Sequence, residues 1–134
     1  MSPLPSNALL LDTTVVIDIL RNRNQRRAWV EQFVLAGGAL AISVISIAEV
    51  YAGLRAGEEP ATRALLANLE WLAISPAIAE RAGFLKAGES RQGRTHSLLD
   101  MMIAATAIEY ECPLATDNQR HFQIPEVRLV PLPR

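Results

Sequence analysis

Four acidic residues, widely separated along a chain of 134 residues, have the chemistry of a divalent-metal site: Asp12, Glu49, Asp100 and Asp117. Carboxylates gathered in one pocket repel one another unless a cation compensates their charge. Mg²⁺ and Mn²⁺ prefer oxygen ligands, and such ions can activate water and stabilise a phosphodiester during its hydrolysis. Because this reaction needs no nucleophile from the protein, the four acids predict metal-dependent phosphodiester hydrolysis if the fold brings them together.

Each acid also has a structural interpretation that stays open from the sequence alone. Asp12 can cap a following helix, since Asp is a preferred N-cap residue. Residues 46–49 (SIAE) and 97–100 (SLLD) both have the spacing of a capping box, which would account for Glu49 and Asp100. The pair Asp117 and Asn118 is typical of turns.

Short apolar runs alternate with helical patterns along the whole chain. The runs that predict strands are 8–12, 39–43, 71–75, 113–116 and 127–130. The segments that predict helices are 14–21, 25–36, 44–56, 60–70, 76–90 and 98–111. This alternation predicts a single α/β domain over residues 1–134, with a parallel sheet of about five strands between helical layers.

The positions of the acids relative to these strands favour a shared site. In open α/β sheets, ligands bind outside the carboxyl ends of the strands. Asp12 closes the first apolar run, and Asp117 follows the fourth. Asp100 lies near the start of the helix before the fourth strand, and Glu49 lies among mostly apolar neighbours in the helix after the second. An acid in that apolar setting indicates that the helix borders a pocket.

The basic residues are the candidates for contact with a substrate phosphate. The net charge of −1 gives no general attraction to nucleic acid, but twelve of the thirteen cations are arginines, whose planar fork suits phosphate. Arg91 and Arg94 precede Asp100 closely and are expected at the rim of the site. The arginines of residues 21–27 form either a second basic patch or an ordinary solvated face. His96 and His121 have no partner acid adjacent in sequence and are expected at the surface.

Several classes of protein are disfavoured by what the sequence lacks. The single cysteine, Cys112, excludes an internal disulfide and fits a reducing compartment. No GxGxxG follows the first strand, which argues against a dinucleotide binder, and Thr14 stands where a dehalogenase-type phosphotransferase needs a second Asp. No apolar run reaches the ~20 residues that span a bilayer, and no signal-peptide pattern is present. We therefore expect a cytoplasmic protein with no membrane partner.

Four segments carry a family resemblance: residues 10–20 (LLDTTVVIDIL), 42–54 (ISVISIAEVYAGL), 98–107 (LLDMMIAATA) and 115–122 (ATDNQRHF). They resemble, in this order, the four motifs of PIN-domain ribonucleases. Their spacing and the chain length are similar to those of the VapC toxins of type II toxin–antitoxin pairs. The resemblance spans about residues 8–130. It implies a PIN-like α/β/α sandwich and an endoribonuclease that depends on Mg²⁺ or Mn²⁺. It also implies a homodimer and a cognate VapB-like antitoxin as partner.

The resemblance also implies roles for individual residues. Asp12 and Asp100 would be the strongest metal ligands, and Glu49 would complete the ligand shell or orient a water molecule. The fourth ligand would be Asp117, which carries the charge, or Asn118, which stands beside it. The expected RNA contacts are Arg91, Arg94, Asn118 and Thr13. The alternative is a PIN-fold RNA-binding or regulatory module without nuclease activity.

Overall fold

The computed structural model describes residues 4–93 and 96–133. Five strands form one parallel sheet: β1 (Ala8–Leu11), β2 (Ala39–Ser43), β3 (Glu70–Leu72), β4 (Leu114–Ala115) and β5 (Leu129–Val130). The α-helices are α1 (Thr13–Leu20), α2 (Arg26–Leu35), α3 (Val44–Ala52), α4 (Glu59–Ala67), α5 (Pro76–Arg91) and α6 (Leu98–Glu109), and η1 (Gln119–Phe122) is a 3₁₀ helix. The predicted α/β class and the parallel sheet of five strands are confirmed.

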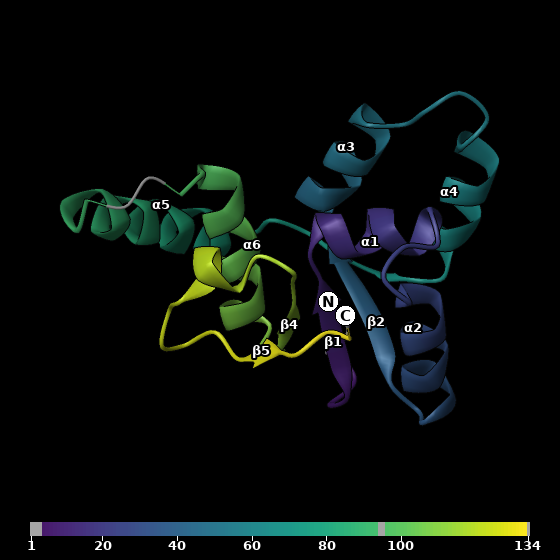
Figure 1. Cartoon of the computed structure of the whole chain (residues 1–134). Coiled ribbons are helices and arrows are strands. Elements are labelled where there is room, and N and C mark those ends of the chain that lie inside the picture. Colours follow the sequence, from purple (N-terminus) through teal and green to yellow (C-terminus); the bar gives the residue numbers. More distant parts are fainter. Residues whose placement is uncertain (1–3, 94–95, 134) are drawn as a thin grey trace.

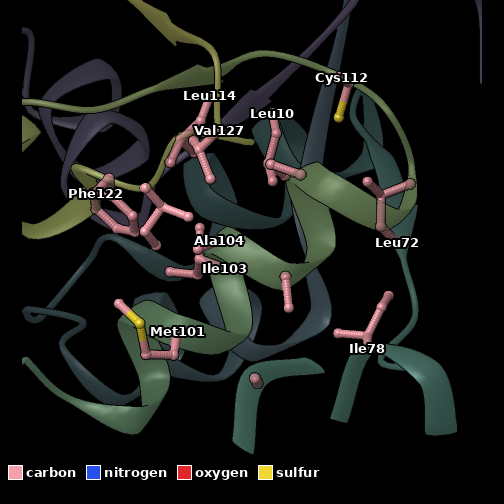
Figure 2. Close-up of a cluster of buried hydrophobic side chains, with 14 of the residues drawn as sticks. Leu10, Leu72, Ile78, Met101, Ile103, Ala104, Cys112, Leu114, Phe122 and Val127 are labelled. Carbon is pink, nitrogen blue, oxygen red and sulfur yellow. The ribbon is translucent and has the colours of Figure 1, made fainter. Parts of the chain in front are cut away.

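The sheet separates two hydrophobic cores, because successive side chains of a strand point to opposite faces. Leu10 of β1 packs with residues of α5 and α6, in the cluster that Figure 2 shows around Ile103 and Leu114. Leu9 and Leu11 pack on the other face with residues of α1 to α4. Figure 1 shows α5 and α6 on one side of the sheet and α1, α2 and α4 on the other. The fold is therefore the predicted α/β/α sandwich.

In the strand order β3-β2-β1-β4-β5, successive strands are added first on one side of β1 and then on the other. The chain winds from β1 to β2 and β3 on one side and to β4 and β5 on the other. In such sheets a crevice opens at the carboxyl ends of the strands where the order reverses. Asp12 directly follows β1, Ser43 is the last residue of β2, and Thr116 directly follows β4. All three residues therefore lie along this edge of the sheet.

Most predicted elements differ by one or more residues from those observed, and three of the differences have a clear local cause. The third strand is Glu70–Leu72 rather than 71–75, because Ser75 caps α5 by accepting a 3.2 Å hydrogen bond from the Ile78 N–H. The helix predicted over 44–56 ends at Ala52, where the N–H of Gly53 bonds to carbonyls of the last turn. The helix predicted over 60–70 is Glu59–Ala67 and is followed directly by the short turn into β3.

In the described part of the chain, no helix is long and apolar enough to cross a membrane.

Candidate active site

Asp12 lies at the centre of the candidate site and is 4% exposed. It is the N-cap of α1, and its Oδ1 accepts a 2.8 Å hydrogen bond from the Thr13 N–H. Its Oδ2 accepts a 2.7 Å hydrogen bond from the hydroxyl of Thr116, at the end of β4. The capping interpretation of Asp12 is thus correct. It does not exclude the chemical one, since the same carboxylate lies at the sheet edge where a ligand is expected.

Glu49 reaches the site from α3 through two hydroxyl groups. Its Oε1 accepts a 2.8 Å hydrogen bond from the hydroxyl of Thr13, the residue next to Asp12. The Oγ atoms of Thr13 and Ser46 are 2.9 Å apart, so Thr13 accepts from Ser46 when it donates to Glu49. The capping-box interpretation of residues 46–49 is wrong. Ser43 caps α3 instead, by accepting a 3.2 Å hydrogen bond from the Ile45 N–H.

Asp100 lies in the first turn of α6, where the cap is Ser97 as its spacing predicted. The Ser97 Oγ accepts a 3.1 Å hydrogen bond from the Asp100 N–H. The Asp100 carboxylate points to another partner. Its Oδ2 lies 3.1 Å from Nδ1 of His121, on η1.

The charges of two other acids act on Asp12. Burial raises the pKa of Asp12 above its ordinary value, and the hydrogen bonds from Thr116 and Thr13 partly oppose this shift. The negative charges of Asp100 and Glu49 raise the pKa of Asp12 further. Asp100 and Glu49 therefore lie near enough to Asp12 for their charges to act on its carboxylate. A cation bound among them would relieve this repulsion.

The donor set fits a hard divalent cation. Asp12, Glu49 and Asp100 offer carboxylate oxygens, which Mg²⁺ and Mn²⁺ prefer over nitrogen or sulfur ligands. Among the residues that the structure describes, no three carboxylate, imidazole or thiol groups stand close enough to hold an ion between them directly. Mg²⁺ commonly keeps several of its water molecules, so water can complete a ligand shell of spaced carboxylates. The residues therefore fit an ion held partly through water.

The fourth predicted acid is engaged elsewhere. The Asp117 carboxylate accepts a hydrogen bond from the guanidinium of Arg26. Asn118 is exposed, and its N–H donates a 3.0 Å hydrogen bond to the hydroxyl of Thr116. Both residues thus belong to the loop that supports Asp12, and the choice between Asp117 and Asn118 as a metal ligand stays a prediction.

Two histidines belong to this end of the molecule, although the sequence offered no partner for either. His96 Nδ1 lies 3.0 Å from Oε2 of Glu89, a buried residue of α5. The rings of His96 and His121 lie 4.8 Å apart, and His121 contacts Asp100. A row of polar side chains therefore runs from α5 to Asp100. For His121, the one available signal was its place just after the fourth strand, at the edge where the acids were expected.

The residues predicted to contact RNA lie in different settings. Thr13 is buried and bonded to Glu49, so it supports the acids from within. Arg91 is the last residue of α5 and is exposed, as a phosphate contact requires. Arg94 lies outside the described residues. The roles of these residues in RNA binding stay predictions.

Comparisons with known proteins agree with this architecture. A family model described as PIN domain matches residues 9–127. The chain is 37% identical over 114 residues to "Ribonuclease VapC10" of Mycobacterium tuberculosis, and the match covers 85% of each protein. In a toxin–antitoxin complex from Klebsiella pneumoniae, one chain matches with a TM-score of 0.77 and 31% identity, over 94% of this chain and 99% of that one. VapBC2 of Rickettsia felis, bound to a promoter DNA fragment, shares the fold with a TM-score of 0.80 and 23% identity, over 92% and 97% of the two chains.

Proposed function

The chain belongs to the PIN domain family, and from this premise we propose that it is a VapC-type ribonuclease toxin that hydrolyses RNA with Mg²⁺ or Mn²⁺. The observation that carries the proposal is Asp12 at the carboxyl edge of the sheet, linked through Thr13 to Glu49 of α3 and close enough to Asp100 of α6 for that charge to raise its pKa. Such a cluster is electrostatically unfavourable by itself, which argues for a bound cation. A relative of 37% identity that bears the name ribonuclease supports the same chemistry.

The carboxylates of Asp12, Glu49 and Asp100 would hold the ion, in part through water. When bound, the ion would activate a water molecule and stabilise the charge that develops on the phosphodiester. Hydrogen bonds of this chain orient the carboxylates for that role: Thr116 holds Asp12, Thr13 holds Glu49, and His121 contacts Asp100. Groups that orient metal ligands in this way commonly tune metal affinity by about 10- to 100-fold. Asp117, the fourth ligand predicted from the sequence, already accepts a hydrogen bond from Arg26 through one of its two carboxylate oxygens.

We further propose that the chain pairs with a VapB-like antitoxin, because similar solved structures are VapBC or toxin–antitoxin complexes. We also propose that it acts in the cytoplasm, since its one cysteine is free, which fits a reducing compartment. The antitoxin would insert an arginine or an apolar segment near the acids Asp12, Glu49 and Asp100, and an arginine would pair bidentately with their carboxylates.

A homodimer through α2 and α3 is proposed as well. Val34 and Leu35 of α2 are 50% and 87% exposed and border a groove of about 670 Å³, so this helix has apolar surface available for a partner. Sedimentation at micromolar concentration tests the dimer, and a monomer would contradict it.

The test of the activity is RNA cleavage by the purified full chain with Mn²⁺, with Mg²⁺ and with EDTA. We expect cleavage with either ion and none with EDTA. The alternative, a PIN-fold module that binds RNA without cutting it, predicts a folded protein that retains RNA under all three conditions and never shortens it.

A further inference from the structure

Arg26 is 1% exposed, which is unusual for a charged side chain. Its Nη1 donates to the carbonyl oxygens of Asn24, at 3.0 Å, and Pro133. Its Nη2 donates to the Asp117 carboxylate. Its Nε lies 3.8 Å from Oδ2 of Asp18, within ion-pair distance but without a hydrogen-bond partner in the described chain. The guanidinium is thus placed between two carboxylates that compensate its charge.

The two carboxylates come from the two segments that hold Asp12. Asp18 lies on α1, the helix whose N-cap is Asp12. Asp117 directly follows Thr116, whose hydroxyl bonds to Asp12. Arg26 therefore links α1, whose N-cap is Asp12, to the loop after β4, in which Thr116 donates a hydrogen bond to Asp12.

Neighbouring arginines do not make this link. Arg21 pairs with Glu58 at 3.1 Å, and Arg27 donates to carbonyl oxygens of α1. In a buried setting, removal of one partner leaves the other charge uncompensated, and the structure around it must shift. Loss of the guanidinium would leave Asp18 with the 3.1 Å hydrogen bond from Asn24 Nδ2 but would remove the partner of Asp117, and the loop beside Asp12 would lose its anchor.

We propose that Arg26 is a positioning residue of the candidate metal site, which acts on Asp12 by pairing with Asp18 and Asp117. This inference rests on the proposed function, because it assumes that Asp12 is a metal ligand. It gives Asp117 the role of an anchor for the loop after β4 rather than that of a ligand. The two roles predict different results when Arg26 and Asp117 are changed together.

The experiment is a titration of the full chain with Mn²⁺. Binding is measured by calorimetry and by the electron paramagnetic resonance signal of free Mn²⁺. The variants are Arg26→Met, Asp117→Leu and the double variant, which replaces the ion pair by two apolar side chains. We expect each single change to weaken Mn²⁺ binding about tenfold, the usual effect of a group that orients a ligand. The double variant should bind about as weakly as either single variant, because both changes break the same link.

The control is Arg21→Gln, which breaks the partly exposed ion pair with Glu58 and leaves Arg26 untouched. We expect its Mn²⁺ affinity to equal that of the unchanged protein. If Arg26→Met does not fold by circular dichroism, Arg26→Lys takes its place in the cycle, since Lys keeps the charge but not the planar fork.

Two kinds of failure can be distinguished. Unchanged Mn²⁺ affinity in folded Arg26 variants would overturn the inference. It would also be overturned if the two losses of affinity multiply in the double variant, because Asp117 would then contribute directly as a ligand. Asp100→Asn runs in the same series as the test of the site itself. If the unchanged protein does not bind Mn²⁺, or Asp100→Asn binds it as well as the unchanged protein, the proposed function falls and this inference falls with it.

Discussion

The hydroxyl of Thr116 donates a 2.7 Å hydrogen bond to Oδ2 of Asp12 and so joins the ends of β4 and β1 at the middle of the sheet. Thr116 is fully buried, so water cannot replace this donor easily. Thr116→Val keeps the shape of the side chain and removes the donor. We expect it to lower the free energy of unfolding by about 1–3 kcal/mol, the usual cost of an unsatisfied buried group.

Thr116→Ser is the matched control, because it keeps the hydroxyl and removes only a methyl group, at a cost of about 1 kcal/mol. In Thr116→Val the pKa of Asp12 should rise further, since the hydrogen bond from Thr116 lowers it. Carbon-13 titration of the Asp12 carboxyl checks this difference. An equal Asp12 pKa in the two variants would show that the hydroxyl does not act on this carboxylate.

Asp12→Asn should stabilise the metal-free protein at neutral pH. Burial, together with Asp100 and Glu49, raises the pKa of Asp12 in the folded state above its ordinary value. The folded state therefore binds the proton more tightly than the unfolded state. Stability from this group is full below the unfolded pKa and is lost as the pH rises through the folded pKa. Asn carries no charge at any of these pH values, so the variant does not lose stability in this way.

We would check this expectation by thermal unfolding in EDTA between about pH 4 and pH 8. This range spans the ionisation of a carboxyl with a raised pKa. The melting temperature of Asp12→Asn should exceed that of the unchanged protein at neutral pH and depend less on pH. Saturating Mn²⁺ should reverse the order, because a ligand that binds only the folded state adds about 2.7 kcal/mol at one hundred times its Kd. A variant that is less stable at neutral pH without metal would argue against crowding of the three carboxylates.

Cys112 should be inert in the folded protein. Burial raises the pKa of its thiol to about 11. At about pH 8 roughly one thiol in a thousand is then ionised, and the thiolate is the reactive form. We expect negligible reaction with Ellman's reagent in native buffer and one thiol per chain in guanidinium chloride. Rapid labelling of the native protein would contradict the buried position of Cys112.

Arg91 and Arg94 are predicted from the sequence to contact the RNA backbone, and Arg91 is exposed at the end of α5. In a background of Asp12→Asn, which we expect to block cleavage, Arg91→Ala with Arg94→Ala should weaken RNA binding and leave folding unchanged. The slope of log affinity against log salt should become shallower by about 0.7 for each phosphate that the protein no longer neutralises. Arg81→Ala is the control, because Arg81 lies on the same helix but pairs with Glu109. Equal slopes for the double variant and its parent would assign both arginines to an ordinary solvated face.

The parts of the fold that follow from local chemistry could be predicted from the sequence. The apolar run before Asp12 indicated a strand buried on both faces, and Ser97 and Asp12 cap helices as their residue types predict. The placement of acids after strands also followed, because parallel strands end at a common edge. Length errors arose where a local signal competed with the apolar pattern, as at Ser75, which starts a helix inside a predicted strand.

What could not be predicted depends on contacts between distant segments. Arg26 lies in a run that can be interpreted from the sequence as either a basic patch or a solvated face, yet it is buried and pairs with Asp117, 91 residues later. His121 and Asp100 are 21 residues apart with no periodic spacing between them. Only the folded chain brings these partners together, so neither the type of each residue nor its neighbours reveal the contact.

The most direct test of the acidic cluster as the catalytic centre is RNA cleavage by Asp100→Asn in the presence of Mg²⁺ or Mn²⁺. The variant keeps the size of the side chain and removes one of the crowded charges, so the fold should remain intact by circular dichroism. We predict that the folded variant binds the divalent ion weakly and leaves RNA uncut under conditions in which the unchanged protein degrades it. Cleavage at the unchanged rate by folded Asp100→Asn would contradict the assignment of the site.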